Sequence, residues 1–316
     1  MHRKLSVLGA LVAALAIAAP VGAITNGTPD TVPGPLPEHP YVGELLFYVP
    51  DAPSSLFVDD GGWFTCTGTL MNATTVLTAG HCTFGIGINS VSTTHDGADT
   101  DAAHGGVHGT DVWVSFAQEP NFDILHASTT FATQAARYAQ WSSALNSTPE
   151  WHRATATPHP LYDDLAFFVH DAGVLTLDSA VSMPKYGALA PEGWLDQYRS
   201  QPRNAHRFET VGYGLERVQG KKEFGGDTRM KSEPKLDSLK SHPADTYIVI
   251  SNNSATGGTC FGDSGGPTFD NTNSNLVVAV TSWGQSPNCG GKGGAYRLDQ
   301  HDDQLFLDGF DIAPAE

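Results

Sequence analysis

The sequence predicts an exported, all-β protein, and three observations lead to this prediction. The chain opens with basic residues, Arg3 and Lys4, and continues as an apolar run from Leu5 to Ala19. Its 316 residues include 34 glycines and 20 prolines but only 16% charged residues, which suits short strands joined by many turns. Its four cysteines are an even number, as expected for disulfides in an exported chain.

The first 23 residues have the layout of a secretory signal peptide, with a basic start, a short apolar core and the small residues Val21-Gly22-Ala23. The apolar run is shorter than the roughly 20 residues that a membrane span needs. Cleavage after Ala23 would make Ile24 the first residue of the mature chain; an uncleaved anchor is the alternative. We therefore expect a secreted, extracellular protein that is not held in a membrane after cleavage.

Removal of residues 1–23 would leave 15 basic and 34 acidic residues, a formal charge of −19. Nucleic-acid binding needs Lys and Arg to contact phosphates, so this charge argues against a nucleic-acid partner. A solubilising role outside the cell is the simpler interpretation. We expect a monomer.

The elements follow in order along the mature chain. An apolar run at 41–49 comes after a segment rich in Pro and Gly, and an Ala-rich stretch at 129–144 favours a short helix. The expected strands are 63–70, 74–78, 165–177, 208–213, 245–251, 276–284 and 294–298. Residues 83–110 are expected to form a long polar loop, and residues 215–240 to be charged and loop-like. Leu305, Phe306 and Phe310 favour a short C-terminal helix.

The four cysteines form two pairs that are local in sequence. The simplest pairing is Cys66–Cys82 and Cys260–Cys289, although three connectivities are open. A zinc site is the alternative, but the sequence has no Cys-x-x-Cys pair. The polar loop at 95–111 lacks the ligand spacing of a calcium site. We expect no cofactor and no metal.

Residues 258–267, Gly-Thr-Cys-Phe-Gly-Asp-Ser-Gly-Gly-Pro, surround the hydroxyl of Ser264 with glycine. These residue types also form ordinary surface turns. A serine nucleophile needs a base within hydrogen-bond reach, and the base needs an orienting acid. Among 13 histidines, His81 stands out in Leu-Thr-Ala-Gly-His-Cys, where small residues surround the ring and Cys82 can fix the backbone.

Three motifs, Leu77-Thr-Ala-Gly-His81-Cys82, Gly262-Asp-Ser264-Gly-Gly-Pro267 and Ser282-Trp-Gly284, resemble the signatures of the trypsin/chymotrypsin-like serine peptidase family. Ile24-Thr-Asn-Gly27 and Val211-Gly-Tyr-Gly214 are also similar to family elements, and the resemblance covers 24 to about 298. It implies two antiparallel six-stranded β-barrels, at 24–185 and 186–316, with the site at their junction. It also implies endopeptidase activity on proteins or peptides, with protein inhibitors as further partners.

The resemblance assigns His81 as the general base and Ser264 as the nucleophile. Asp171 is the expected orienting acid, preferred over Asp164 because an apolar strand pattern and a turn follow it. The N–H groups of Gly262 and Ser264 would form the oxyanion hole.

By position, Gly258 would form the floor of the primary specificity pocket, Gly284 and Gly294 its walls, and Ser282 and Trp283 a flanking strand. A neutral floor favours bulky apolar residues before the cut. The amine of Ile24 would pair with Asp263 after signal cleavage, with no separate pro-segment.

Two alternatives remain. Gly262-Asp-Ser264-Gly-Gly266 also fits the loose G-x-S-x-G elbow of α/β-hydrolases, but the 52 residues after Ser264 read as strands. A secreted binding protein that keeps the fold and has lost turnover is the alternative from a different functional class.

Overall fold

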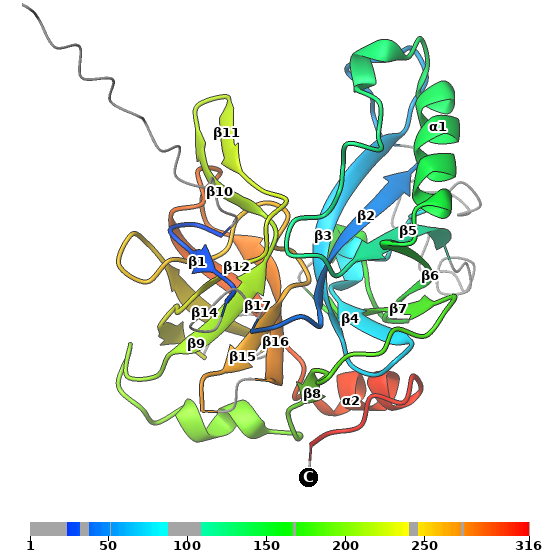
Figure 1. The fold of residues 1–316 in the computed structure, drawn as a ribbon. Helices are drawn as coiled ribbons and strands as arrows, with labels where there is room; N and C mark the ends of the chain where they lie inside the picture. The colour runs from blue at the N-terminus through cyan, green and yellow to red at the C-terminus, as the bar shows by residue number, and fades with distance from the viewer. Residues whose placement is uncertain are drawn as a thin grey trace, which may run out of the picture.

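The computed structural model describes residues 24–31, 38–50, 52–87, 109–166, 169–239, 246–272 and 275–315. Two β-sheet units lie side by side, with helix α1 along the outer side of one and helix α2 near the C-terminal end (Figure 1). The expected signal peptide and most of the expected polar loop lie outside the described residues. Within the described ranges, no helix combines the length and hydrophobicity of a membrane span.

The first unit is a closed antiparallel barrel with the strand order β2-β3-β4-β7-β6-β5. Its strands are β2 (Val42–Val49), β3 (Gly62–Leu70), β4 (Thr75–Thr78), β5 (Gly109–Ser115), β6 (Trp151–Pro158) and β7 (Gly173–Leu177). The strands predicted at 63–70 and 74–78 are confirmed as β3 and β4. The strand predicted at 165–177 is too long, because residues 164–166 form a 3-10 turn and β7 begins only at Gly173.

Alternate residues of the barrel strands pack into two different cores. Leu45 on β2 and Val112 on β5 belong to the interior cluster. Leu46 and Trp113, one position further along each strand, pack instead with Leu145 of α1. Because successive side chains of a strand point to opposite faces, the helix gives the outer face of the barrel its own apolar cover.

Helix α1 (Gln134–Ser147) begins at a side-chain cap. The Thr133 hydroxyl accepts the N–H of Ala136 at 3.1 Å, and the Asp59 carboxylate accepts the N–H groups of Gln134 and Ala135 at 2.8 and 3.0 Å. These acceptors satisfy the unpaired N–H groups of the first turn. The helix predicted over 129–144 is therefore confirmed, but it starts and ends later. The 3-10 turns are η1 (Gly80–Cys82), η2 (Ser128–Thr130), η3 (Asp164–Ala166) and η4 (Trp194–Tyr198).

The second unit is a curled nine-stranded sheet, and no closure of it is recorded among the described residues. Eight strands follow the order β1-β12-β9-β15-β16-β17-β14-β13, and β8 pairs with β16. Its strands are β1 (Thr28–Pro29), β8 (Ala188–Leu189), β9 (Phe208–Gly212), β12 (Met230–Ser232), β13 (Leu236–Ser238), β14 (Tyr247–Asn252), β15 (Pro267–Asp270), β16 (Leu276–Gly284) and β17 (Gly291–Arg297). The all-β fold is thus confirmed, with a half-barrel in place of the second closed barrel.

The prediction of a loop over residues 215–240 is wrong. Strands β10 (Leu215–Gln219) and β11 (Lys222–Gly225) form a hairpin, and β12 and β13 follow it. Gly220, at φ +63°, lies in the two-residue turn between β10 and β11, where positive φ is required. The hairpin projects from the sheet (Figure 1), so few of its residues are apolar and the usual strand pattern is missing.

The N-terminal end of the described chain pairs with the second unit, and its C-terminal end forms hydrogen bonds with the first. Strand β1 pairs with β12 of the second sheet. Beyond α2 (His301–Asp308), which confirms the predicted C-terminal helix, the carbonyl of Phe310 accepts hydrogen bonds from Asn72 and Thr75 of the first barrel at 3.4 and 3.3 Å. The division into domains at residue 185 stays a prediction, and the terminal segments cross it.

Both predicted disulfides are confirmed. Cys66–Cys82 joins β3 to η1 across 16 residues, and Cys260–Cys289 spans 29 residues of the second unit. Closing loops of these sizes stabilises a fold by roughly 3–4 kcal/mol in the chain-entropy model.

A buried ionic network joins the N-terminal segment to both units. Nδ1 of His39 lies 2.6 Å from Asp30, and its Nε2 lies 3.1 Å from Glu209 on β9. Arg229 is 1% exposed and donates to Asp30 at 2.8 Å and to the carbonyl of Val42 on β2 at 3.1 Å. Burial disfavours a charge on His39, but the two carboxylates outweigh that effect and raise its pKa to about 9.

We expect His39→Gln to destabilise the protein by about 3 kcal/mol near pH 6 and by much less near pH 9.5. A raised histidine pKa gives stability that is complete below the unfolded value of 6.5 and is lost as the pH rises through about 9. Urea unfolding at the two pH values measures the difference, with the exposed His126→Gln as the control. An equal loss at both pH values would contradict the prediction.

Candidate active site

The His81 side chain lies at the junction of the two units because a 3-10 turn ends β4 there. Turn η1 follows β4 directly, and the disulfide of Cys82 ties this turn to β3. A Cβ at Gly80 would lie 2.7 Å from the ring of Tyr162, so only glycine allows the turn to approach this ring. The small residues of the sequence motif therefore have a local steric reason.

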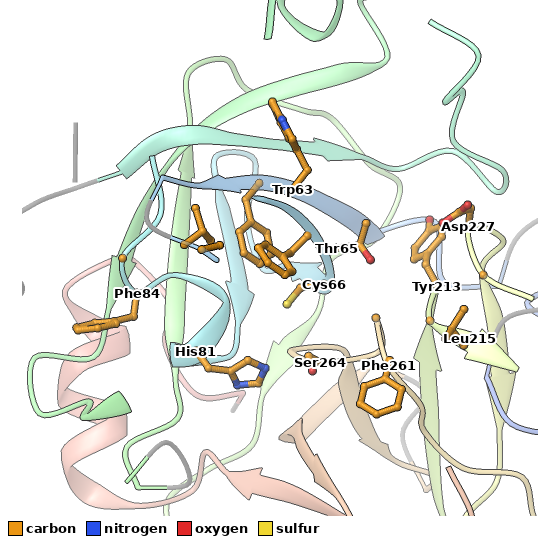
Figure 2. A pocket seen from close by; sticks show the side chains of 18 of the residues that line it. Trp63, Thr65, Cys66, His81, Phe84, Tyr213, Leu215, Asp227, Phe261 and Ser264 are labelled. Carbon is orange, nitrogen blue, oxygen red and sulfur yellow. The ribbon is translucent and has the colours of Figure 1, made fainter. Parts of the chain in front are cut away.

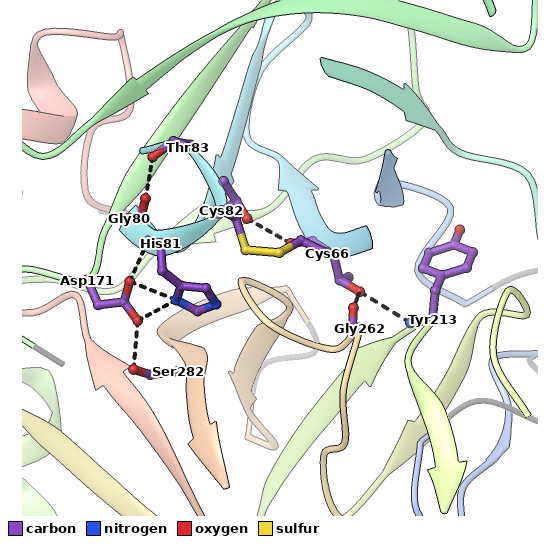
Figure 3. The surroundings of a disulfide bond; sticks show 11 residues. Cys66, Gly80, His81, Cys82, Thr83, Asp171, Tyr213, Gly262 and Ser282 are labelled. Carbon is purple, nitrogen blue, oxygen red and sulfur yellow. Dashed lines mark hydrogen bonds and ion pairs between the residues drawn. A yellow bond between two sulfur atoms is a disulfide. The ribbon is translucent and has the colours of Figure 1, made fainter. Parts of the chain in front are cut away.

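Asp171 holds the His81 ring (Figure 3). Its carboxylate has no exposed surface and accepts the backbone N–H of His81 at 2.9 Å. Both of its oxygens lie 3.0 Å from Nδ1 of His81, and the hydroxyl of Ser282 on β16 donates to Oδ2 at 2.6 Å. Asp164, the other candidate acid, lies in η3 and lines the same pocket as His81, but no hydrogen bond from it to the His81 ring is found among the described residues.

The contact with Asp171 sets both the tautomer and the charge of His81. Because a carboxylate only accepts, Nδ1 carries the proton and Nε2 of the neutral ring is free to accept one. Burial lowers the pKa of His81, but the negative charge of Asp171 and its hydrogen bond outweigh this and raise the pKa. Asp171 therefore orients the His81 ring as a base and stabilises the protonated form of that ring.

Ser264 and His81 line one pocket of about 860 Å³. Figure 2 shows the imidazole directed toward the Ser264 side chain across this pocket. No hydrogen bond between the two side chains is recorded in the described part of the chain. In resting enzymes this contact is often long and tightens only when substrate is bound, so the arrangement is compatible with proton transfer.

The loop before Ser264 leaves two backbone N–H groups unused. The carbonyl of Phe261 accepts the N–H of Leu215 at 2.7 Å, and a planar peptide then directs the N–H of Gly262 the opposite way. Gly262 has φ +95°, which favours glycine. Within the described residues, neither the Gly262 nor the Ser264 N–H donates a hydrogen bond, so both are available to an oxygen anion.

A second pocket of about 410 Å³ adjoins Ser264. Ser282, Trp283 and Gly284 line it, and no described residue of its lining is charged. Gly258 and Gly294 are not in direct contact with it. At Gly258 a Cβ would lie 2.4 Å from the Asn252 side chain, and at Gly294 a Cβ would lie 2.0 Å from the Trp283 ring. Gly294 thus makes room for the Trp283 ring that lines the pocket, and Gly258 makes room for Asn252, which does not line it.

Ile24 and Asp263 are both fully buried, and both contact Gly214. The N–H of Ile24 donates to the carbonyl of Gly214 at 3.2 Å, and Asp263 accepts the N–H of Gly214 at 2.8 Å. Burial raises the pKa of Asp263 to about 7, against the effect of backbone donors from Cys260 and Gly214. The expected pair therefore converges on one residue, Gly214, from its two sides.

Sequence reasoning missed the apolar rim of the larger pocket. Phe64 and Phe261 border it with 47% and 58% exposed surface, and Leu215 and Glu223 of the β10–β11 hairpin line its far side. The signal that could have revealed the hairpin is its two-residue turn at Gly220 and Lys221.

Three groups of His, Cys and acidic residues within the described ranges have spacings that a metal could use. One contains Cys66 and Cys82, whose sulfurs form a disulfide. In another, the rings of His159 and His170 are parallel within 7°, so their in-plane lone pairs do not converge on one ion. The third centres on His39, which is already ion-paired. None is a convincing metal site.

We expect Asp171→Asn to lower the pKa of His81 below its ordinary value near 6.5. Burial of the ring remains while the negative charge that opposes it is removed. NMR titration of the His81 ring measures the shift. Asp164→Asn is the matched control and should leave the titration unchanged; the reverse result would identify Asp164 as the partner.

The comparisons with known proteins bear on the family and the fold of this chain. Residues 131–300 match the family Trypsin, a stretch that includes Asp171 and Ser264 and begins after His81. No curated protein matches the sequence. Among solved structures, a collagenase is similar at 16% identity with a TM-score of 0.57, over 91% of this chain and 98% of that one.

Two further solved structures share the fold. A scabies mite inactivated protease paralogue has 14% identity and a TM-score of 0.53, over 92% of this chain and 97% of that chain. A mutant of human heparin binding protein has 15% identity and a TM-score of 0.53, over 93% and 100% of the two chains. With the family match extending over more than half of its length, this chain belongs to the trypsin family.

Proposed function

We propose that this protein is a secreted serine endopeptidase that acts through Ser264, His81 and Asp171. The observation that supports this most directly is the buried Asp171 carboxylate bonded to Nδ1 of His81, with Ser264 lining the same pocket as the ring. Its substrates would be proteins or peptides, since the pocket lined by His81 and Ser264 is not an enclosed cavity.

The proposed reaction begins with attack of the Ser264 oxygen on the peptide carbonyl carbon, while Nε2 of His81 takes the hydroxyl proton. Asp171 keeps the ring in the required tautomer and stabilises the imidazolium. His81 then gives the proton to the leaving amine, the C–N bond breaks and an acyl-enzyme remains. Water attacks the ester in the second half, with His81 again taking and returning a proton.

The unused N–H groups of Gly262 and Ser264 would bind the oxygen that becomes negative in each tetrahedral intermediate. Their orientation exists before the substrate arrives, so no reorganisation is needed during the reaction. A single donor of this kind lowers the barrier by about 3 kcal/mol.

The uncharged second pocket supports cleavage after bulky apolar residues. An Arg or Lys side chain buried there would have no acidic partner among the described lining residues, at considerable cost. Trp283 is among the residues that line this pocket.

The contacts of Ile24 support activation by signal cleavage itself. A free α-ammonium at Ile24 would lie beside Gly214, the residue whose N–H binds Asp263, and it would stabilise the ionised Asp263. Neutralising the buried carboxylate in this way would fix the loop that carries Ser264.

A binding protein without turnover is the alternative function. One similar structure is named as an inactivated protease paralogue, and another is named as a heparin binding protein. This chain retains His81, Asp171 and Ser264 together with Gly262, which favours catalysis.

We expect a fluorophosphonate probe to label the mature protein on Ser264, because only an activated serine reacts with it. Ser264→Ala should abolish labelling, and Ser286→Ala, at a serine of the neighbouring pocket, should retain it. Mass spectrometry of labelled peptides locates the adduct. A folded wild-type protein that is not labelled would favour the binding protein.

We expect chromogenic peptides with Phe or Leu before the scissile bond to be cleaved at least tenfold faster than the Arg peptide, measured as kcat/KM. The reason is the absence of charge in the second pocket. Preference for Arg would refute this interpretation of the pocket.

We expect N-terminal sequencing of the secreted protein to begin at Ile24. A protein carrying one extra glycine before Ile24 should lose most activity, because its amine cannot reach the same position. A start well before or after Ile24 would reject the proposal.

The activity of the native form should fall at alkaline pH, because the α-ammonium of Ile24 loses its proton above its ordinary pKa of about 8.

A further inference from the structure

A threonine hydroxyl from the first unit reaches the loop that forms the anion site in the second. Thr67 follows Cys66 on β3 and has no exposed surface. Its hydroxyl donates to the carbonyl of Gly262 at 2.9 Å and accepts the N–H of Tyr213 at 3.2 Å. Figure 3 shows both contacts meeting between Gly262 and Tyr213.

The backbone of Thr67 contacts the same loop. Its N–H donates to the carbonyl of Ser264 at 2.8 Å, and its own carbonyl accepts the hydroxyl of Thr78 at 2.9 Å. One residue of β3 therefore holds the carbonyls of both Gly262 and Ser264, the two residues whose N–H groups are unused.

These contacts matter because Gly262 has the freedom to rotate. With φ at +95° and no side chain, its flanking peptides can turn at little steric cost. The preceding peptide is held by Leu215, whose N–H donates to the Phe261 carbonyl at 2.7 Å, and the following peptide is held by the Thr67 hydroxyl at 2.9 Å. Without the hydroxyl, one of the two restraints is lost.

We propose that Thr67 is a positioning residue whose hydroxyl, by holding the Gly262 carbonyl, restrains rotation about the Gly262 backbone and so helps to keep the N–H of the preceding Phe261–Gly262 peptide in the orientation that binds the reaction's oxygen anion. The hydroxyl suits this task because it both donates and accepts, so it links the Tyr213 N–H to the Gly262 carbonyl. It acts through Gly262 and touches no substrate. The catalytic part of this inference rests on the proposed function.

The chain supplies a matched control on the same strand. Thr69 lies two positions along β3, is also fully buried, and its hydroxyl has no hydrogen-bond partner among the described residues. Thr→Val at position 67 or 69 thus removes a buried hydroxyl of equal size, but only the change at 67 removes a contact to the loop.

The kinetic test compares Thr67→Val, Thr67→Ser and Thr69→Val with a Phe peptide substrate. Thr67→Val should lower kcat about tenfold with KM nearly unchanged, because the missing contact serves the transition state. Thr67→Ser keeps the hydroxyl and should retain at least half of kcat, as should Thr69→Val. Equal losses in Thr67→Val and Thr69→Val, or a change in KM alone, would overturn the proposal.

A second measurement does not depend on turnover. Labelling with carbonyl-13C Phe and 15N Gly selects the amides of the three Phe-Gly pairs at 84–85, 224–225 and 261–262. In a Ser264→Ala background, Thr67→Val should shift or broaden the Gly262 amide signal and leave the other two in place. Thr67→Ser should restore it.

The two measurements separate the two ideas. If the wild-type protein has no activity but its Gly262 signal responds to Thr67→Val as expected, the proposed function fails and the positioning role stands. If the protein is active and the Gly262 signal and kcat of Thr67→Val match the wild type, the positioning role fails.

Discussion

The Asp171 carboxylate has no contact with solvent, and this burial constrains the whole arrangement. A buried carboxylate must have its oxygens satisfied, and here the donors come from both units: the backbone and ring of His81 from the first, the hydroxyl of Ser282 from the second. A displacement of one unit against the other would leave this charge short of a donor. The junction and the charged state of His81 therefore depend on the same hydrogen bonds. Tyr213, whose hydroxyl donates to the carbonyl of Val42 at 3.1 Å, and Arg229 connect the units at another point of the junction.

Much of the site was predictable from the sequence because close backbone packing requires glycine at some positions and the disulfides require cysteine at others. Gly80, Gly262 and Gly265 each lie where a Cβ would meet another group at 2.8 Å or less, and such positions leave a strong pattern around His81 and Ser264. The cysteine pairing followed from proximity along the chain. In the first barrel, apolar runs indicated β2, β3 and β4, which are buried over most of their length, whereas β5 and β6 were not among the predicted strands.

The rest depended on contacts between distant segments, which leave no local pattern. No residue of the β10–β11 strands is fully buried, so these strands lack an alternating pattern of apolar residues, and residues 215–240 resembled a loop. Thr67 is an unremarkable strand residue until Gly262, 195 positions later, is folded against it. The buried ion pairs of His39 with Asp30 and Glu209 could not be predicted from the sequence either, because charged residues normally lie at the surface. Gly258 was assigned as a pocket floor by counting from the nucleophile, whereas the folded chain puts the Asn252 side chain in the space next to it.

Each of the two disulfides closes a covalent loop that contains part of the proposed site, so the redox state of the compartment affects how that site is held. The ring closed by Cys260 and Cys289 contains Ser264, Ser282 and Trp283, while the ring closed by Cys66 and Cys82 contains Thr67 and His81. Each covalent loop thus holds one side of the Ser–His pair. In a reducing compartment both segments would be released from their cross-links, and the nucleophile and its base would be carried on untethered stretches of chain. If the proposed peptidase function holds, formation of the two disulfides and assembly of the site would be coupled, and the chain would become active only in an oxidising compartment.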